Sequence, residues 1–237
     1  MERVYYRYIF RLKSPLALGS GISDNTDSDV LLDSRGVPYI PATSIAGVIR
    51  HSVDEDTARE LFGTIQNGSG EMSKVLTYDA VCTGKNAVSV RDSVRLNNKV
   101  AEDTGKFDFE AVETGAEFRG YIELADCGAD GDSVINEAFQ KINAGLLRFG
   151  HKTTRGYGTV AVEGLRRIRF SNVDDWLDFD MFDDECWKKA QVVELTNPSD
   201  LTGITLSLKQ QGGISIRRYS TVSYTHLRAH ETGRNLV

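Results

Sequence analysis

The sequence predicts an α+β protein, and three of its features lead to this class. Val4 to Leu12 alternates apolar with polar residues, as a half-buried strand does. Apolar residues recur at helical spacing after Thr43 and again in Ser133 to Leu147. Segments rich in β-forming residues lie between and after these helices, so the order is strand, helix, strands, helix, strand. That is the order of a βαββαβ, ferredoxin-like domain, an architecture shared with RNA-recognition modules.

The first half of the chain continues with a loop and two helices. Gly19 to Asp29 is polar and rich in Gly and Asp, which predicts a loop. Thr43 or Ser44 can cap the first helix. Its predicted apolar face consists of Ile45, Val48, Ile49 and Val53. Thr57 to Phe62 predicts a second, shorter helix that ends at Gly63.

The second half holds the remaining strands. Val75 to Cys82 and Ala87 to Leu96 are rich in β-formers, and we expect them to pair with each other. Asn97 to Thr114 is polar and poorly periodic, which indicates a long inserted excursion, such as a projecting hairpin. Glu117 to Leu124 predicts another strand. Tyr157 to Val162 predicts the last strand of the domain, after a glycine-rich turn.

We expect four regions along the chain. Residues 1–170 form the ferredoxin-like domain. Residues 171–198, which hold Trp176 and Trp187 among many acids, form an acidic linker or a small packed excursion. Residues 199–222 form the first strand of a truncated second copy of the domain, since Gly203 to Arg218 resembles the opening of the chain. Residues 223–237 resemble translated adaptor sequence, and we expect a non-native tail there.

The composition is that of an ordinary globular protein, with 40% hydrophobic and 26% charged residues. The three cysteines are far apart and lack CxxC spacing. This pattern disfavours a zinc site or disulfide framework and favours reduced thiols in the cytoplasm. No apolar run approaches the roughly 20 residues that a membrane span needs. We therefore expect a cytoplasmic protein without a membrane partner.

The net charge of −6 argues by itself against a nucleic-acid partner, but the charge is unevenly distributed. Six Lys and Arg residues lie between Arg148 and Phe170, where Glu163 is the sole acid. Acidic residues then crowd residues 174–185. The sequence therefore predicts a basic face followed by an acidic segment.

The segment Gly145 to Val160, GLLRFGHKTTRGYGTV, carries the strongest motif. Glycines allow a backbone to approach a phosphate closely and expose its N–H groups, while Lys, Arg and Thr side chains add donors. The alternative is a plain turn in which the glycines only fix the backbone. A dinucleotide site is a weaker interpretation, because a dinucleotide loop leads from strand into helix and this one leads from helix into strand.

Three ordered stretches together resemble the RAMP superfamily, the repeat-associated proteins of CRISPR effectors. The first is the glycine-rich segment above. The second is Asp27 to Arg50, DSDVLLDSRGVPYIPATSIAGVIR, which is similar to a block in backbone subunits of type III complexes. The third is Ser93 to Leu124, which is similar to the segment that forms the projecting thumb of those subunits. The resemblance covers Arg3 to about Phe170.

The resemblance implies a role for Asp27. In type III backbone subunits an Asp at the matching loop position is required for metal-dependent cleavage of target RNA. Asp27 would be catalytic and a metal ligand, with Mg²⁺ as the possible cofactor, because a carboxylate can hold a hard cation. It could instead orient the 2′-hydroxyl for in-line attack. A solvated loop acid is the structural alternative, and Asp24, Asp29 and Asp33 are neighbouring competitors.

The remaining candidates are expected to bind RNA. Ser44 lies at a helix start, where N–H groups favour a phosphate, and Arg50 can reach phosphate or pair with a nearby acid. Phe107 and Phe109 could separate stacked bases or pack within the hairpin. The RNA-binding candidates are Ser44, Arg50, Gly150, Lys152, Thr153, Thr154, Arg155, Gly156 and Gly158. Ala42 and Ala46 stand where the family often has Gly and Lys, which weakens the phosphate contacts expected at this helix.

Three functions remain open at this point. The chain can be a type III backbone subunit that holds guide RNA, contacts other effector subunits and cleaves complementary target RNA at Asp27. It can be the same subunit without catalysis. It can also be a stand-alone endoribonuclease that processes CRISPR RNA, which would need an acid/base pair of histidines, and His51 and His151 are not obviously paired in sequence.

Overall fold

The computed structural model describes residues 2–21, 24, 26–66, 69–97, 100–196, 205, 207 and 209–212. Of the predicted strand at 199–222, only residues 205, 207 and 209–212 are described, and these lie in no strand. The predicted tail, residues 223–237, lies outside the described residues.

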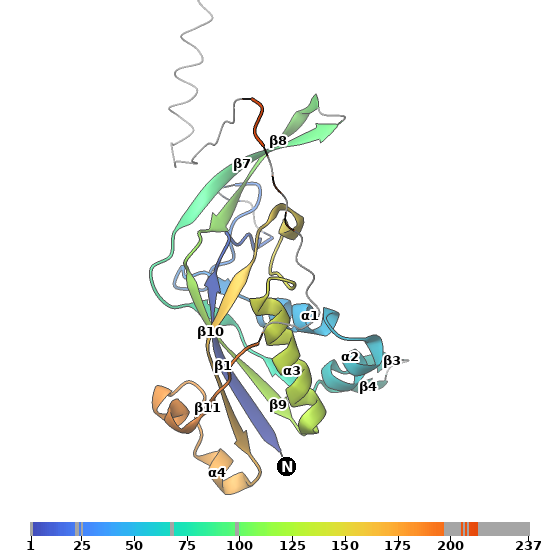
Figure 1. Cartoon of the computed structure of the whole chain (residues 1–237), viewed down its shortest axis with the longest axis vertical. Coiled ribbons are helices and arrows are strands. Elements are labelled where there is room, and N and C mark those ends of the chain that lie inside the picture. The colour runs from blue at the N-terminus through green and yellow to red at the C-terminus, as the bar shows by residue number, and fades with distance from the viewer. Residues whose placement is uncertain are drawn as a thin grey trace, which may run out of the picture.

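A seven-stranded antiparallel sheet forms the centre of the molecule (Figure 1). Its long strands are β1 (Arg3–Leu12), β9 (Glu117–Ala125) and β10 (Val160–Phe170). Its short strands are β2 (Tyr39–Ile40), β5 (Val75–Thr77), β6 (Ala80–Cys82) and β11 (Gln191–Val192). The order is β11-β10-β1-β9-β6-β2, with β5 also paired to β9. The α+β class is confirmed, since helices and antiparallel strands build one domain.

The alternation along β1 separates the two faces of the sheet. Tyr6, Tyr8 and Phe10 are fully buried and pack with Phe139 of α3 (Gly128–Asn143). Helix α1 (Ala42–His51) contributes Ile45 and other apolar residues to the same core. Helix α2 (Glu55–Phe62) follows α1 and lies beyond it, next to a small hairpin of β3 (Thr64–Gln66) and β4 (Ser69–Glu71) (Figure 1).

The helix boundaries differ from the predicted ones because tertiary contacts decide them. Helix α1 begins at Ala42, directly after its N-cap Pro41, which has no side chain that can cap it, so the predicted capping by Thr43 or Ser44 is wrong. The Ala42 N–H donates instead to Oδ1 of Asp79 at 2.7 Å, so an acid from the turn between β5 and β6 satisfies the first N–H of the helix. Helix α2 does have a side-chain cap, since Asp54 accepts a hydrogen bond from the Thr57 N–H. Gly63 ends α2 as predicted.

The strand pairing expected between residues 75–82 and 87–96 is wrong. Residues 75–82 instead form β5 and β6, which both pair with β9. Residues 88–97 form β7 (Val88–Asn97), which pairs with β8 (Val100–Val112). This hairpin projects from the domain (Figure 1), so β8 has little of the hydrophobic alternation by which buried strands are recognised.

Residues 171–190, which we name the acidic strap, pack on the sheet face opposite α1 and α3. The strap contains α4 (Val173–Leu177) and a 3₁₀ turn, η2 (Asp184–Lys189). Trp187 is fully buried in a cluster with Tyr5, Tyr121 and Phe170 of the sheet. The sequence left open whether this segment is an acidic linker or a small packed excursion, and its described residues pack against the sheet. Among the described helices, none combines the length and the apolar character needed to cross a bilayer.

Candidate functional site

The glycine-rich loop connects α3 to β10 and contains a short 3₁₀ turn, η1 (Thr153–Arg155). Gly150 and Gly158 have positive φ angles, of 76° each. A Cβ at Gly150 would lie 2.3 Å from the carbonyl oxygen of Ala17, and one at Gly158 would lie 1.8 Å from that of Phe149. These glycines are therefore needed for close packing of backbone on backbone. Gly156 also has a positive φ, but open space surrounds it.

Part of the polar backbone of this loop is used by the fold itself. The N–H of His151 donates to Ala17 at 2.8 Å, and the N–H of Gly158 donates to Pro15 at 2.9 Å. Arg148 donates to the Thr153 carbonyl at 2.7 Å, which braces the loop from inside. Among the side chains that remain at the surface, Thr153 is half-buried, whereas Arg148, His151, Thr154 and Arg155 are exposed.

Lys152 attaches the loop to the hairpin. Its backbone is left-handed, with φ of 60°, and its Nζ lies 4.2 Å from the ring centroid of Phe109 and 4.8 Å from that of Phe107. Burial lowers the pKa of the Lys152 amine, and the Arg155 charge lowers it further. Phe109 is buried at 3% exposure and contacts Tyr157. Of the two alternatives for Phe107 and Phe109, the structure places them in packing contacts between the hairpin and the loop.

A cavity of about 860 Å³ brings the glycine-rich loop and the start of α1 together. Ser44, Gly47 and Val48 line it from α1, and a third segment adds Leu18, Gly19 and Leu31. The glycine-rich loop contributes Gly145, Leu146, Leu147, Arg148, Gly150, His151, Thr153 and Thr154. Two of the three sequence motifs therefore meet at one concave surface.

Two histidines, His51 and His151, also line this cavity, which their spacing in the sequence did not predict. Both are exposed. They are 100 positions apart in the chain, so only the return of the chain after α3 brings them to one cavity. Sequence signals gave no sign of this arrangement, because a single surface histidine has no periodic or motif context.

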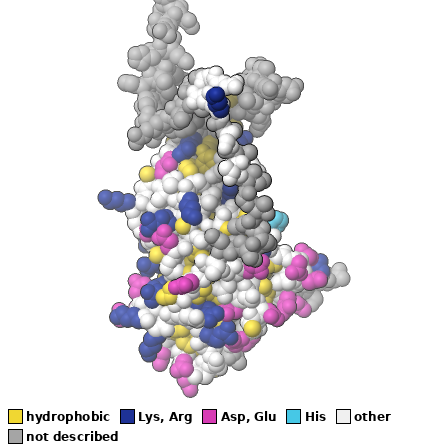
Figure 2. All heavy atoms as spheres, viewed as in Figure 1, with side chains coloured by type: hydrophobic (Ala, Val, Ile, Leu, Met, Phe, Trp, Pro, Cys, Tyr) yellow, Lys and Arg dark blue, Asp and Glu magenta, His cyan; other side chains and the backbone are white. Residues whose placement is uncertain are grey.

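Arg50 does not line the cavity and is directed toward α2. Its Nη1 donates to the Gly63 carbonyl at 3.4 Å, and its Nη2 lies 3.9 Å from Oε1 of Glu55. The sequence left open whether Arg50 binds phosphate or pairs with a nearby acid, and its contacts here are those of a surface ion pair. Acidic side chains gather over α2 (Figure 2), where Glu55, Asp56 and Glu60 lie, so this side of the molecule is unfavourable for phosphate.

The basic run from Arg148 to Arg169 does not form one open surface. Arg167 and Arg169 both bind the buried carboxylate of Asp132, and Arg166 donates to the Trp187 carbonyl. Because β10 alternates its side chains between two faces, a run of charges along it is divided between them. The cations left with exposed side chains near the cavity belong to the glycine-rich loop, with Arg155 the most accessible of its candidates.

Asp27 is exposed and lies in a loop that docks on β8. Its Oδ2 accepts the Asp108 N–H at 2.9 Å, and its own N–H donates to Oδ1 of Asp108 at 2.9 Å. A third contact, from the Val30 N–H to Glu110 at 2.9 Å, fixes the same loop to the hairpin. Asp27 thus lies at the junction of loop and hairpin, where Oδ1 has no partner among the described residues.

The competing acids near Asp27 have structural partners. Asp29 is buried and accepts hydrogen bonds from Thr26 and Asp24. Asp33 closes a turn with Arg35, and the hydrogen bond from the Val37 N–H lowers the pKa of its carboxyl. Asp24 is exposed like Asp27, and what distinguishes Asp27 is the second carboxylate, that of Asp108, beside it.

The described residues hold no group of three or more His, Cys, Asp and Glu side chains arranged around a common metal position. Asp27 and Asp108 together offer carboxylate oxygens, which are the ligands Mg²⁺ prefers, but they do not complete its shell. Such a partial set fits an ion that is shared with a bound polyanion and water.

A family model described as RAMP superfamily matches residues 9–161. The fold is similar to that of a chain in the cryo-EM structure of the Type III-B Cmr-beta bound to cognate target RNA, with a TM-score of 0.57 and 19% identity over 70% of this chain. This chain covers 61% of the length of that one. A chain of Type III-B Cmr-beta in the apo state gives a TM-score of 0.54 and 14% identity, with 67% and 96% of the two chains covered. No curated protein matches the sequence.

Proposed function

Because the chain belongs to the RAMP superfamily, we propose that it is an RNA-binding backbone subunit of a CRISPR type III effector complex. The guide RNA would lie along the cavity between the glycine-rich loop and the start of α1, and neighbouring effector subunits would contact the faces of the domain. The observation that carries the proposal is that two separate sequence motifs line one cavity.

The chemistry of the cavity supports RNA as the ligand. Thr153, Thr154 and Ser44 line the cavity with hydroxyl donors, and the exposed Arg155, which does not line it, follows Thr154 in the same loop and adds a charge. Such groups contact phosphate and sugar without reading bases, which suits a protein that must hold guides of any sequence. The half-buried Lys152 contributes mainly by holding the loop against Phe109.

We further propose that Asp27 takes part in cleavage of target RNA beside the guide-binding cavity. Gly19, a cavity residue, pairs with Val30 of the Asp27 loop, so the loop borders the cavity. The Asp27 carboxylate, with Asp108 beside it, would hold Mg²⁺ against the RNA, or it would orient the attacking 2′-hydroxyl. A bound Mg²⁺ would stabilise charge on the phosphate.

Two alternatives have support of their own. A subunit without catalysis fits the observation that the Asp27 carboxylate already accepts a hydrogen bond from the fold. An endoribonuclease that processes CRISPR RNA fits the presence of His51 and His151 at one cavity. General acid–base cleavage of RNA needs two such groups near the same phosphate.

The proposal is tested with the assembled effector, a complementary RNA and Mg²⁺, comparing the parent with Asp27→Asn. Asparagine keeps an oxygen that can accept the Asp108 N–H, so the loop should keep its shape. We expect guide and target RNA to stay bound and cleavage to slow by about a hundredfold or more, the range for loss of a positioned reactive group.

Asp108→Asn tests the second carboxylate of the pair, since its remaining oxygen can still accept the Asp27 N–H. Slower cleavage in both variants would assign the metal to the two carboxylates together, and slower cleavage in Asp27→Asn alone would assign the chemistry to Asp27. Full cleavage by Asp27→Asn would contradict a catalytic role for Asp27. A parent complex that binds no RNA would contradict the proposed function. Cleavage of repeat RNA by the isolated chain, lost on His51→Ala or His151→Ala, would favour the processing enzyme.

A further inference from the structure

A second cavity, of about 320 Å³, lies between the acidic strap and the sheet face that the strap covers. Its walls are mainly aromatic rings, contributed by Tyr5, Tyr78, Trp176, Phe179 and Phe182. Tyr5 comes from β1 and Tyr78 from the turn between β5 and β6, whereas the other three belong to the strap. Nothing in the proposed RNA site uses this cavity, which shares none of its lining residues with the first.

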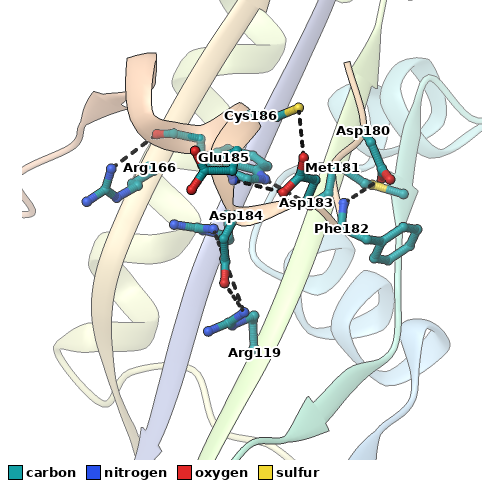
Figure 3. A network of polar contacts seen from close by, with 11 residues as sticks. Arg119, Arg166, Asp180, Met181, Phe182, Asp183, Asp184, Glu185 and Cys186 are labelled. Atoms are coloured by element: carbon teal, nitrogen blue, oxygen red, sulfur yellow. Dashed lines mark hydrogen bonds and ion pairs between the residues drawn. The ribbon is translucent and has the colours of Figure 1, made fainter. Parts of the chain in front are cut away.

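Two carboxylates complete the cavity. Glu123 of β9 is 7% exposed, and its oxygens accept hydrogen bonds from Arg3 at 2.5 Å and from the Tyr78 hydroxyl at 3.1 Å. Burial, together with the Glu123 charge, raises the pKa of Tyr78 to about 12, so this hydroxyl stays a neutral donor. Asp180 adds an exposed carboxylate from the strap. Figure 3 shows Asp180 beside Phe182, whose N–H donates to it at 2.8 Å.

The wall of this cavity already binds one guanidinium of the chain itself. The Arg3 guanidinium carbon lies 5.5 Å from the centroid of the Trp176 ring, and Arg3 pairs with Glu123. Aromatic faces attract cations because their faces carry negative charge, and a buried carboxylate strengthens the attraction. Because Arg3 already neutralises Glu123, a second cation would use the carboxylate of Asp180 and the neighbouring rings of Phe179 and Phe182.

The surroundings select a protein over a nucleic acid. Seven acidic residues lie in the strap, at positions 174, 175, 178, 180, 183, 184 and 185. Asp184 pairs with Arg7 and Arg119, and Glu185 pairs with Lys188. Figure 3 shows Asp184 directed toward Arg119. Asp180 is the acid of the strap that lines this cavity, and the excess of acids along the strap disfavours phosphate. Leu177 and Phe182 are 68% and 64% exposed, so the cavity also has an apolar edge on which a peptide could pack.

We propose that this aromatic cavity receives the arginine side chain of a basic protein partner, with the guanidinium against the Trp176, Phe179 and Phe182 rings and near Asp180. Arginine is one of the residues that act as interface anchors, and such anchors concentrate their binding energy in small pockets. The inference goes beyond the RNA site, since it needs neither RNA nor Asp27.

The test uses the full chain, labelled with ¹⁵N, and two small probes. The indole N–H signal of Trp176 is followed during titration with N-acetyl-arginine amide and, separately, with N-acetyl-citrulline amide, a neutral analogue of the same shape. A saturable shift is expected with the arginine probe, at concentrations at least about tenfold lower than with citrulline, because the charge supplies the attraction. Trp176→Phe identifies the signal.

Two variants separate the cavity from general charge. Asp180→Asn should weaken arginine binding by about threefold, the size expected for one partly exposed ion pair. Asp174→Asn removes the same charge from the strap outside the cavity and should leave binding unchanged. Equal binding of the two probes, equal effects of the two variants, the lack of any shift, or a tighter response to oligouridylate RNA would each overturn the proposal.

Discussion

At Gly158 the backbone lies so close to another segment of the chain that no side chain would fit between them. A Cβ there would be 1.8 Å from the Phe149 carbonyl oxygen, and the residue also has a φ of 76°. Gly156, two positions earlier, has a φ of 89° but no neighbour within 4 Å of its Cβ position. The two glycines of one motif therefore have different physical roles.

Gly158→Ala should lower the free energy of unfolding by about 3 kcal/mol or more, because a clash with backbone adds to the left-handed strain. Gly156→Ala has the strain alone and should cost about 1 kcal/mol. Urea denaturation of both variants measures the difference. Similar losses of unfolding free energy in the two variants would show that the close approach of Gly158 to Phe149 adds nothing to the cost of a side chain there.

Residue identities singled out several residues that share one cavity but did not reveal their tertiary contacts, and the RNA-binding role of these residues stays a prediction. The glycine-rich segment and Ser44 do line one cavity. The role of Lys152 depends on the rings of Phe107 and Phe109, which are distant in sequence. The role of Arg50 depends on an acid of the neighbouring helix α2. No local pattern records such partners, so sequence alone leaves alternatives open there.

Among the elements, the acidic strap is held chiefly by one side chain. Trp187 is fully buried, its indole N–H donates to the Met181 carbonyl at 2.8 Å, and Arg7 lies 5.1 Å from its ring centroid. Acidic composition predicts a solvated segment, and two tryptophans predict packing. The segment packs because burying the large Trp187 ring is favourable, while the acids around it stay at the surface and keep their solvation.

Trp187→Ala should cost about 3–5 kcal/mol of stability, the range for removal of a large buried aromatic side chain. It should also make the strap the first site of cleavage in limited proteolysis, since the strap loses its main anchor. Phe182→Ala, in the same segment but 64% exposed, is the control and should cost less than about 1 kcal/mol. A strap that stays protected without Trp187 would show that its other contacts suffice.

The elements that sequence predicted best are those with one buried face. Strand β1 and the apolar face of α3 were recognised because alternation and helical spacing reflect burial directly. Strand β8 and the partners of β5 and β6 were not, because pairing is decided by where β9 lies in the sheet. The finer, ferredoxin-like description stays a prediction beside the confirmed α+β class.

Over the whole molecule, the position of the charges matters more than the net charge. The acids of α2 and of the strap account for much of the net charge of −6, and they lie away from the lining residues of the large cavity. A negative protein can therefore present a local surface suited to RNA and a separate surface suited to a basic protein. The two proposed sites follow from this separation.

The most direct measurement of the central claim is single-stranded RNA binding by the full chain at several salt concentrations. Arg155→Gln should weaken binding by about fivefold to tenfold and reduce the slope of log affinity against log salt by about one, as loss of one phosphate contact does. Arg35→Gln, which removes a 72% exposed cation that lies outside the glycine-rich loop, should change neither quantity. Equal effects of the two variants, or no effect of Arg155→Gln, would contradict a glycine-rich loop that holds RNA.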